Sequence, residues 1–190
     1  MKPMSRKCEQ FTDSVIRRMT RISLQYNAIN LAQGFPDFDP PKELLDRLAE
    51  VSYQGPHQYP ITMGAPNFRQ ALARKAGRFM GLSLDPETNM VITIGSTEAM
   101  VDTIFALTNH GDKIAMFSPY FENYRAQAIM ADCEPVFIPL VPPTFDFDPN
   151  VIEDAFKTGV KAILICNPSN PSGKVFTYDE LKTIADLCIK

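Results

Sequence analysis

The stretch that decides the fold of this chain runs from residue 161 to residue 173 and reads KAILICNPSNPSG. Its opening is continuously apolar after the lysine, as expected of a strand that is buried on both faces of a parallel sheet. Two prolines and a glycine then end the strand and constrain the following loop. Asn167 and Asn170 place two amides at the carboxyl end of the strand, where open α/β sheets bind ligands. Taken alone, the same residues are compatible with a Pro/Asn turn that binds nothing.

Upstream of this stretch, short apolar runs alternate with helical patterns. We expect strands at residues 90–94, 113–117, 136–138 and 161–166, separated by helices at residues 97–108, 123–131 and 151–157. Such an alternation predicts an α/β fold with a largely parallel sheet and helices on both of its faces.

The first third of the chain has a different pattern. Apolar residues recur at helical spacing from Phe11 to Ile22, and an extended segment rich in proline and aspartate follows at residues 30–41. Pro41 is suited to the first turn of a second helix, and residues 68–79 indicate a third. We therefore expect a helical N-terminal arm before the sheet.

At the other end, Thr177 and Glu180 have the spacing of a capping box. They precede an apolar stripe formed by Leu181, Ile184, Ala185 and Cys188. The stripe runs to the last residue, without a glycine cap or a further strand. We therefore expect the sequence to be incomplete at its C-terminus.

Composition excludes several classes of function. The chain has 190 residues and a net charge of −3, with both signs interleaved, so nucleic acid and anionic membranes are poor partner predictions. No apolar run approaches the ~20 residues of a membrane span, and a cytoplasmic protein is expected. The two histidines lack metal-ligand spacing, so no metal site is predicted. The scattered cysteines are expected to be reduced and mostly buried: Cys8, Cys133, Cys166 and Cys188.

Two further segments have the chemistry of a binding site. Gly95, Ser96 and Thr97 join a predicted strand to a predicted helix, where backbone N–H groups and hydroxyls can bind an anion, although a plain N-cap at Thr97 is equally compatible. Residues 118–124 follow the next strand and contain three aromatics that could stack on a flat ligand, although core packing is the commoner role for any one of them. Together these loops predict a pocket for a small, flat, phosphorylated aromatic.

In this order, the motifs resemble those of the class I and II aminotransferases, pyridoxal-phosphate enzymes of fold type I, and most resemble the glutamine/aromatic (kynurenine-type) and methionine transaminase-like members. The resemblance covers nearly the whole chain and implies a pyridoxal 5'-phosphate cofactor. It implies that Ser96 and Thr97 bind the cofactor phosphate and that Phe121 stacks on the pyridine ring. Asn170 would hydrogen-bond the phenolic oxygen and help to bind the substrate carboxylate.

The same resemblance assigns roles to the N-terminal part of the chain. Gly34 would lie against the substrate carboxylate, and Tyr59 would reach the cofactor phosphate of a neighbouring subunit, which implies a homodimer. Residues 1–45 would form the N-terminal helix and substrate-loop segment, as part of a small domain. Residues 46–190 would form the first part of the large, cofactor-binding domain.

Three residues that the family needs for catalysis are missing from this sequence, and their absence limits the predicted function. The Schiff-base lysine, an aspartate for the pyridine nitrogen and an arginine for the substrate carboxylate all lie beyond Lys190 in the family pattern. Lys174 stands in the wrong place for the Schiff base and is predicted to be a solvated loop lysine. The parent protein would be an aminotransferase acting on an amino acid and a 2-oxo acid, whereas this chain alone would be inactive.

Two alternatives stay open at this point. One is a pyridoxal-phosphate-dependent C–S lyase of the same fold, because the cofactor scaffold does not fix the reaction. The other is a non-catalytic ligand-binding protein, or a fragment that depends on a partner chain.

Overall fold

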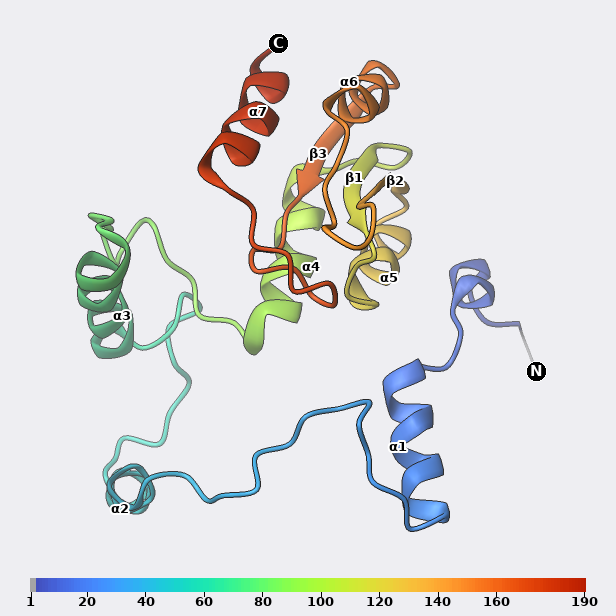
Figure 1. The fold of residues 1–190 in the computed structure, drawn as a ribbon. Helices are drawn as coiled ribbons and strands as arrows, with labels where there is room; N and C mark the ends of the chain where they lie inside the picture. Colours follow the sequence, from blue (N-terminus) through green and yellow to red (C-terminus); the bar gives the residue numbers. More distant parts are fainter. Residues whose placement is uncertain (1–2) are drawn as a thin grey trace. The chain divides into compact units, whose positions relative to one another are not determined.

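The computed structural model describes residues 3–190, which divide into two compact units (Figure 1). One unit contains Gly95–Lys190 together with the described residues up to Thr12, and the other contains Asp13–Ile94. We describe each by itself. The assignment of residues 1–45 and 46–190 to two domains stays a prediction.

The first unit is built on a parallel sheet of three strands in the order β2-β1-β3. These strands are β1 (Lys113–Ser118), β2 (Glu134–Pro139) and β3 (Val160–Leu164). The central strand β1 pairs in parallel with both neighbours, and its Ala115 lies opposite Val136 and Ile163. Four consecutive residues of β1 are buried, as expected of a strand that is covered on both faces. The prediction of an α/β fold with a parallel sheet is thereby confirmed.

Helices cover both faces of this sheet. Successive side chains of β1 point to opposite faces, so each face presents apolar side chains on which helices pack. Ala115 and Phe117 join a core cluster with Ile152 and Ile184 of the helices α6 and α7. The neighbouring residues of β1, including Met116, join a second cluster with residues of α4 and α5. The bounds of these helices are α4 (Gly95–Leu107), α5 (Asn123–Met130), α6 (Pro149–Lys157) and α7 (Tyr178–Ile189), and a 3₁₀ helix precedes them at η1 (Arg6–Gln10).

The start of α7 forms the predicted capping box. The Thr177 hydroxyl accepts a hydrogen bond from the Glu180 N–H at 3.2 Å, and the Glu180 carboxylate accepts one from the Thr177 N–H at 2.7 Å. The predicted apolar stripe needs correction, because Ala185 and Cys188 are exposed. The residues of α7 that pack on the core are Leu181, Ile184 and Leu187. The buried face is therefore rotated from the one that we expected.

The second unit contains the three expected helices, α1 (Val15–Gln25), α2 (Lys42–Ser52) and α3 (Pro66–Met80). The strand expected at residues 90–94 is not formed among the described residues. A strand requires a neighbour for its backbone groups, and Ile92 instead donates its N–H to the Met63 carbonyl of a turn at 3.1 Å.

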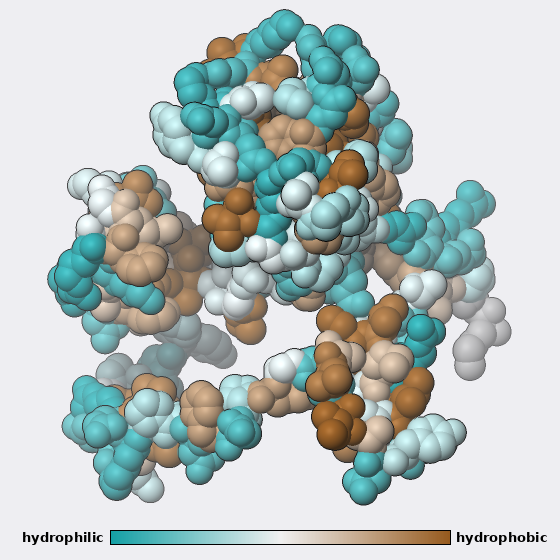
Figure 2. All heavy atoms as spheres, viewed as in Figure 1, coloured by the Kyte–Doolittle hydropathy of each residue, from teal (hydrophilic) through white to brown (hydrophobic). Residues whose placement is uncertain are grey.

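Apolar side chains of this second unit are largely exposed, as the hydrophobic residues along α1 in Figure 2 illustrate. Each described helix is too short or too polar to cross a membrane. All four cysteines are free, but Cys8 and Cys188 are exposed and Cys133 alone is fully buried, so the prediction of mostly buried thiols is wrong.

Candidate active site

The loops that follow β1 and β3 meet at the carboxyl edge of the sheet. A small hollow lies there, and its lining includes Pro119, Tyr120 and Tyr124 from the first loop and α5. Cys166 and Asn170 line it from the loop after β3. This is the edge at which parallel sheets bind ligands, so the structure brings two of the three predicted binding segments into one place.

The third predicted segment is the N-terminus of α4. The helix begins at Gly95, whose φ of +73° is a left-handed conformation that glycine adopts without strain. Ser96 and Thr97 are exposed in its first turn, where backbone N–H groups lack intrahelical acceptors. The arrangement has the donors and the helix dipole of an anion site.

Two side chains of α5 hold this helix end in place. Asn123 donates a hydrogen bond from Nδ2 to the Thr97 hydroxyl at 3.3 Å. Gln127, which is 4% exposed, donates from Nε2 to the Thr97 carbonyl at 2.9 Å. Because Asn123 lies two residues after Phe121, these contacts bring the predicted phosphate turn beside the aromatic segment.

The aromatic residues of that segment have different environments. Tyr120 stacks on Phe137 of β2, with ring centroids 5.0 Å apart and planes inclined by 12°, so it serves packing. Phe121 is half-buried and meets Tyr124 at 5.7 Å with an interplanar angle of 75°. Of the three aromatics, Tyr120 is thus packed face to face against another ring, whereas Phe121 and Tyr124 meet edge to face.

Tyr124 and Cys166 also line the hollow. From the sequence, Tyr124 is one of three aromatics that could stack on a ligand, and Cys166 has no predicted role in a site. Burial, together with a hydrogen bond to the Cys166 thiol, raises the pKa of the Tyr124 hydroxyl to about 12. The hydroxyl therefore stays protonated at neutral pH. The signals available in the sequence were indirect: Tyr124 lies three residues after Phe121, and Cys166 lies just after β3.

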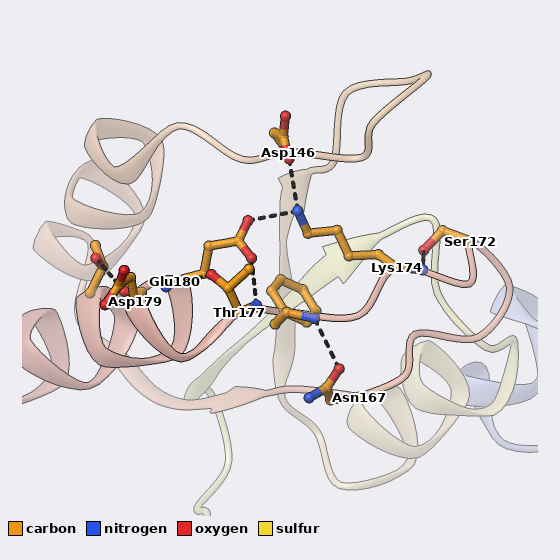
Figure 3. Close-up of polar contacts among 9 residues, drawn as sticks. Asp146, Asn167, Ser172, Lys174, Thr177, Asp179 and Glu180 are labelled. Atoms are coloured by element: carbon orange, nitrogen blue, oxygen red, sulfur yellow. Dashed lines mark hydrogen bonds and ion pairs between the residues drawn. The ribbon is translucent and has the colours of Figure 1, made fainter.

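The two asparagines of the loop after β3 have separate functions. The Asn167 side chain accepts a hydrogen bond through Oδ1 from the Phe176 N–H at 3.0 Å, so it anchors the loop (Figure 3). Asn170 is exposed and lines the hollow, and no hydrogen bond of its side chain is found within residues 3–190. The bonds Asn167-Pro168 and Asn170-Pro171 are both cis. Asn170 is thus the amide that is available to a ligand.

Lys174 is not the solvated lysine that we expected. Its side chain is only 8% exposed, and its ammonium lies 2.7 Å from Asp146 and 2.6 Å from Glu180 (Figure 3). Hydrogen bonds to these carboxylates raise the pKa of Lys174 above its ordinary value. A nucleophilic lysine needs a lowered pKa, so this environment disfavours a Schiff-base role.

The remaining predicted residues belong to the other unit. Gly34 and Tyr59 are both exposed there, and the Tyr59 side chain is almost fully accessible. Over residues 3–190, no cluster of three metal-ligating side chains is present.

A parallel α/β sheet with polar and aromatic loops at its carboxyl edge defines a broad class of proteins. Similarity to solved structures identifies the group within this class. YbdL from Escherichia coli, described as a methionine aminotransferase, superposes with a TM-score of 0.92 and 30% identity, over all of this chain and 49% of its own. N-succinyldiaminopimelate aminotransferase from Mycobacterium tuberculosis gives a TM-score of 0.91 at 30% identity, over 98% of this chain and 49% of its own. The fold is therefore that of fold type I aminotransferases.

Sequence comparison gives the family. The profile of aminotransferase class I and II matches residues 26–190, and the chain belongs to this family, as the motifs predicted. The probable N-succinyldiaminopimelate aminotransferase DapC of Mycobacterium tuberculosis is 32% identical over 94% of this chain and 46% of its own length. Kynurenine–oxoglutarate transaminase 3 of the mouse is 31% identical over 98% of this chain and 43% of its own length. The chain spans about half the length of the curated relatives it matches.

Members of this family depend on pyridoxal 5'-phosphate, as we expected from the motifs. The residues at the sheet edge fit that group. A helix N-terminus suits a phosphate, a half-buried aromatic suits a ring, and the unpaired amide of Asn170 suits a polar ring substituent.

Proposed function

We propose that the polypeptide carrying this chain is a pyridoxal-phosphate-dependent aminotransferase that moves an amino group between an amino acid and a 2-oxo acid. One observation carries the proposal: in a chain of this family, the N-terminus of α4 is hydrogen-bonded to α5 just after Phe121, at the sheet edge that also presents Asn170. When bound, the cofactor supplies an electron sink for the substrate's reacting carbon.

The residues of the sheet edge then have distinct tasks toward the cofactor. The N–H groups of the first turn of α4 and the hydroxyls of Ser96 and Thr97 bind the phosphate. Phe121 stacks on the pyridine ring and fixes its plane. Asn170 donates its amide hydrogen to the phenolic oxygen, which favours the ionised form of that oxygen.

Substrate binding and assembly complete the proposal. Gly34 and Asn170 bind the substrate carboxylate, and Tyr59 binds the cofactor phosphate of a neighbouring subunit in a cytoplasmic homodimer. The names of the relatives refer to succinyldiaminopimelate, kynurenine and methionine, which differ in size and charge. The substrate is therefore proposed only as a class.

The lysine that holds the cofactor is proposed to lie outside residues 1–190. The observation behind this is the engagement of Lys174 by two carboxylates, which keeps it cationic. On this proposal the 190-residue chain by itself has no transaminase activity.

The test uses the natural polypeptide that contains this chain, loaded with pyridoxal 5'-phosphate and supplied with an amino acid and a 2-oxo acid. Formation of a new amino acid supports the transaminase. Pyruvate and ammonia from a cysteine-type substrate would identify a lyase instead, and cofactor binding without any product would identify a non-catalytic binder.

Asn170→Ala and Asn170→Asp test the site itself. Both remove a preorganised donor, and we expect kcat/KM to fall about 10²–10³-fold, the scale found when one such donor is removed. The absorption spectrum of the bound cofactor should shift as well. An unchanged spectrum together with unchanged activity would refute the role of Asn170.

A further inference from the structure

The loop that carries Asn170 is closed on itself by backbone hydrogen bonds. The Gly173 N–H donates to the Ser169 carbonyl at 2.8 Å, and the Ser169 N–H donates to the Lys174 carbonyl at 2.8 Å. The Lys174 N–H reaches the Ser172 hydroxyl at 3.3 Å. These bonds make residues 169–174 one small closed unit, so the position of Asn170 depends on what holds this unit to the rest of the fold.

Besides the Phe176 ring, which is buried in the core just after this unit, two polar side chains attach it, one on each side of Asn170. On the near side, Asn167 is hydrogen-bonded to the Phe176 N–H. On the far side, the Lys174 ammonium joins two carboxylates that come from different elements. Asp146 lies in the turn between β2 and α6, and its carbonyl accepts a hydrogen bond from the Val141 N–H at 2.8 Å.

The second partner, Glu180, ties the loop to α7. One of its oxygens accepts a hydrogen bond from Lys174 and the other accepts one from the Thr177 N–H in the capping box. A single carboxylate therefore fixes both the start of α7 and the end of the asparagine loop (Figure 3). The Lys174 ammonium also lies 5.7 Å from the centre of the Phe176 ring, within cation–π range.

Lys174 differs from the other ion-paired lysines in how little of its side chain is exposed. Every other ion-paired lysine in the described part of the chain has at least 36% of its side chain exposed, against 8% for Lys174: Lys7, Lys42, Lys157, Lys182 and Lys190. Exposed pairs contribute little to stability. Its partners are more accessible, with 64% of the Asp146 side chain and 22% of the Glu180 side chain exposed, so the shielded part of this cluster is the contact between Lys174 and Glu180.

We propose that Lys174, through Asp146 and Glu180, is a positioning residue that sets the place of Asn170 against the phenolic oxygen of the cofactor. This inference rests on the proposed function. Lys174 itself touches neither cofactor nor substrate in this scheme. Its loss removes the ionic attachment at the end of the closed loop, while the Asn167 hydrogen bond and the buried Phe176 ring stay in place.

The experiment compares Lys174→Met with Lys182→Met in the natural polypeptide. Lys182 lies on α7 and pairs with Asp186 four residues on, with 55% of its side chain exposed, so the control makes the same chemical change away from the loop. Hydrogen exchange of the Ser169 and Gly173 amides is measured first, without cofactor. Lys174→Met should speed it about tenfold or more, the scale for losing charged hydrogen bonds, and Lys182→Met should leave it within about twofold.

Cofactor binding gives the second readout. For Lys174→Met we expect the Kd of pyridoxal 5'-phosphate to rise about tenfold and the pH midpoint of the bound cofactor's visible absorption to rise, because a displaced donor stabilises the ionised oxygen less. Lys174→Arg, which keeps a cation between the carboxylates, should restore part of both. Glu180→Gln keeps the capping box and serves the same test if Lys174→Met does not fold.

The outcomes separate the two proposals. Unchanged exchange, Kd and pH midpoint in Lys174→Met and Glu180→Gln, with normal cofactor binding by the wild type, would overturn the role of Lys174 alone. Faster exchange without any change in the pH midpoint would also overturn it, since Lys174 would then be merely structural. A wild type that binds no pyridoxal 5'-phosphate would overturn the proposed function and this inference with it.

Discussion

The two units of this chain are stabilised in different ways. In the unit built on Gly95–Lys190, apolar side chains from β1, β2, α4, α5, α6 and α7 are buried in two clusters on either side of the sheet, and those of β3 pack against them partly buried. In Asp13–Ile94, the fully buried residues are Ser23 and Arg69, which are both polar. Amphipathic helices form in both units, but only the sheet provides a surface that their apolar faces cover. Helical periodicity thus predicts a helix without predicting its burial.

In the second unit, the large buried side chain is that of Arg69, and it joins neighbouring segments through polar contacts. Its side chain is 1% exposed, and its guanidinium donates to the carbonyls of Gly64 and Pro86 and pairs with Glu87. These contacts join α3 to the turn before it and to the loop after it. This unit is therefore organised by polar contacts and backbone geometry.

The largest expected effect comes from the core of the first unit. Ile184→Ala truncates a side chain that is 1% exposed in the core cluster between the sheet and the helices α6 and α7. We expect a loss of about 2–5 kcal/mol in the free energy of unfolding. The matched control is Ile189→Ala on the same helix, where the side chain is 85% exposed. Urea unfolding followed by circular dichroism measures both. Equal effects of the two substitutions would contradict the claim that buried apolar side chains stabilise this unit.

Gly64→Ala tests the second unit. Gly64 has φ of +98°, and an added Cβ would lie 2.2 Å from Cγ1 of Ile92, so both the backbone and the contact resist a side chain. We expect a loss of about 1–3 kcal/mol, seen as faster hydrogen exchange in α3.

The control for this change is Gly77→Ala, inside α3. Its nearest contact for an added Cβ is an ordinary one, 3.6 Å from the Leu82 carbonyl oxygen, and alanine should stabilise the helix by roughly 0.5–1 kcal/mol. If Gly64→Ala were as well tolerated as Gly77→Ala, backbone geometry would not be what holds this unit.

A smaller effect is expected from Thr177→Ala, which removes the cap of α7. The loss of this side-chain acceptor should cost about 1 kcal/mol in the urea experiment. Thr183→Ala, within the same helix, removes only a hydroxyl that bonds the Asp179 carbonyl and should cost less than half as much. A similar loss in both variants would mean that the capping box is not a separate source of stability.

The smallest effect is the pH dependence of the Lys174 cluster. Hydrogen bonds with Lys174 lower the pKa of Asp146, and hydrogen bonds with Lys174 and Thr177 lower that of Glu180 against the opposing effect of burial. The stability from both carboxylates is therefore present above their ordinary values of 3.8 and 4.5 and is lost as pH falls through the lowered values.

The same cluster raises the pKa of Lys174, so its contribution is present below 10.5 and is lost as pH rises through the raised value. The difference in melting temperature between wild type and Lys174→Met should be constant from about pH 5 to 10 and shrink outside that window. A difference that does not vary with pH would assign the effect to packing.

The parallel sheet, its flanking helices and the site at its carboxyl edge could be predicted because strand and helix periods alternate clearly after residue 95. The strand expected at residues 90–94 could not be judged from its apolar pattern, since pairing depends on a neighbour that the pattern does not contain. The burial of Lys174 was also unpredictable, because Asp146 lies 28 residues away.

Within the site, the sequence pointed to the asparagine loop but could not distinguish the two amides. The Asn167 side chain accepts a hydrogen bond from the Phe176 N–H, whereas Asn170 lines the hollow, where a ligand could contact it. This difference arises only when the loop folds back on itself. The roles of Gly34, Tyr59, Ser96, Thr97 and Phe121 stay predictions until they are tested.

Locating the lysine that holds the cofactor is the sharpest test of the proposed aminotransferase. The natural polypeptide is loaded with pyridoxal 5'-phosphate, reduced with borohydride and mapped by peptide mass spectrometry. We expect a phosphopyridoxyl label on a lysine outside residues 1–190 and none on Lys174. A label on Lys174, on any other lysine of this chain, or on no lysine at all would contradict it.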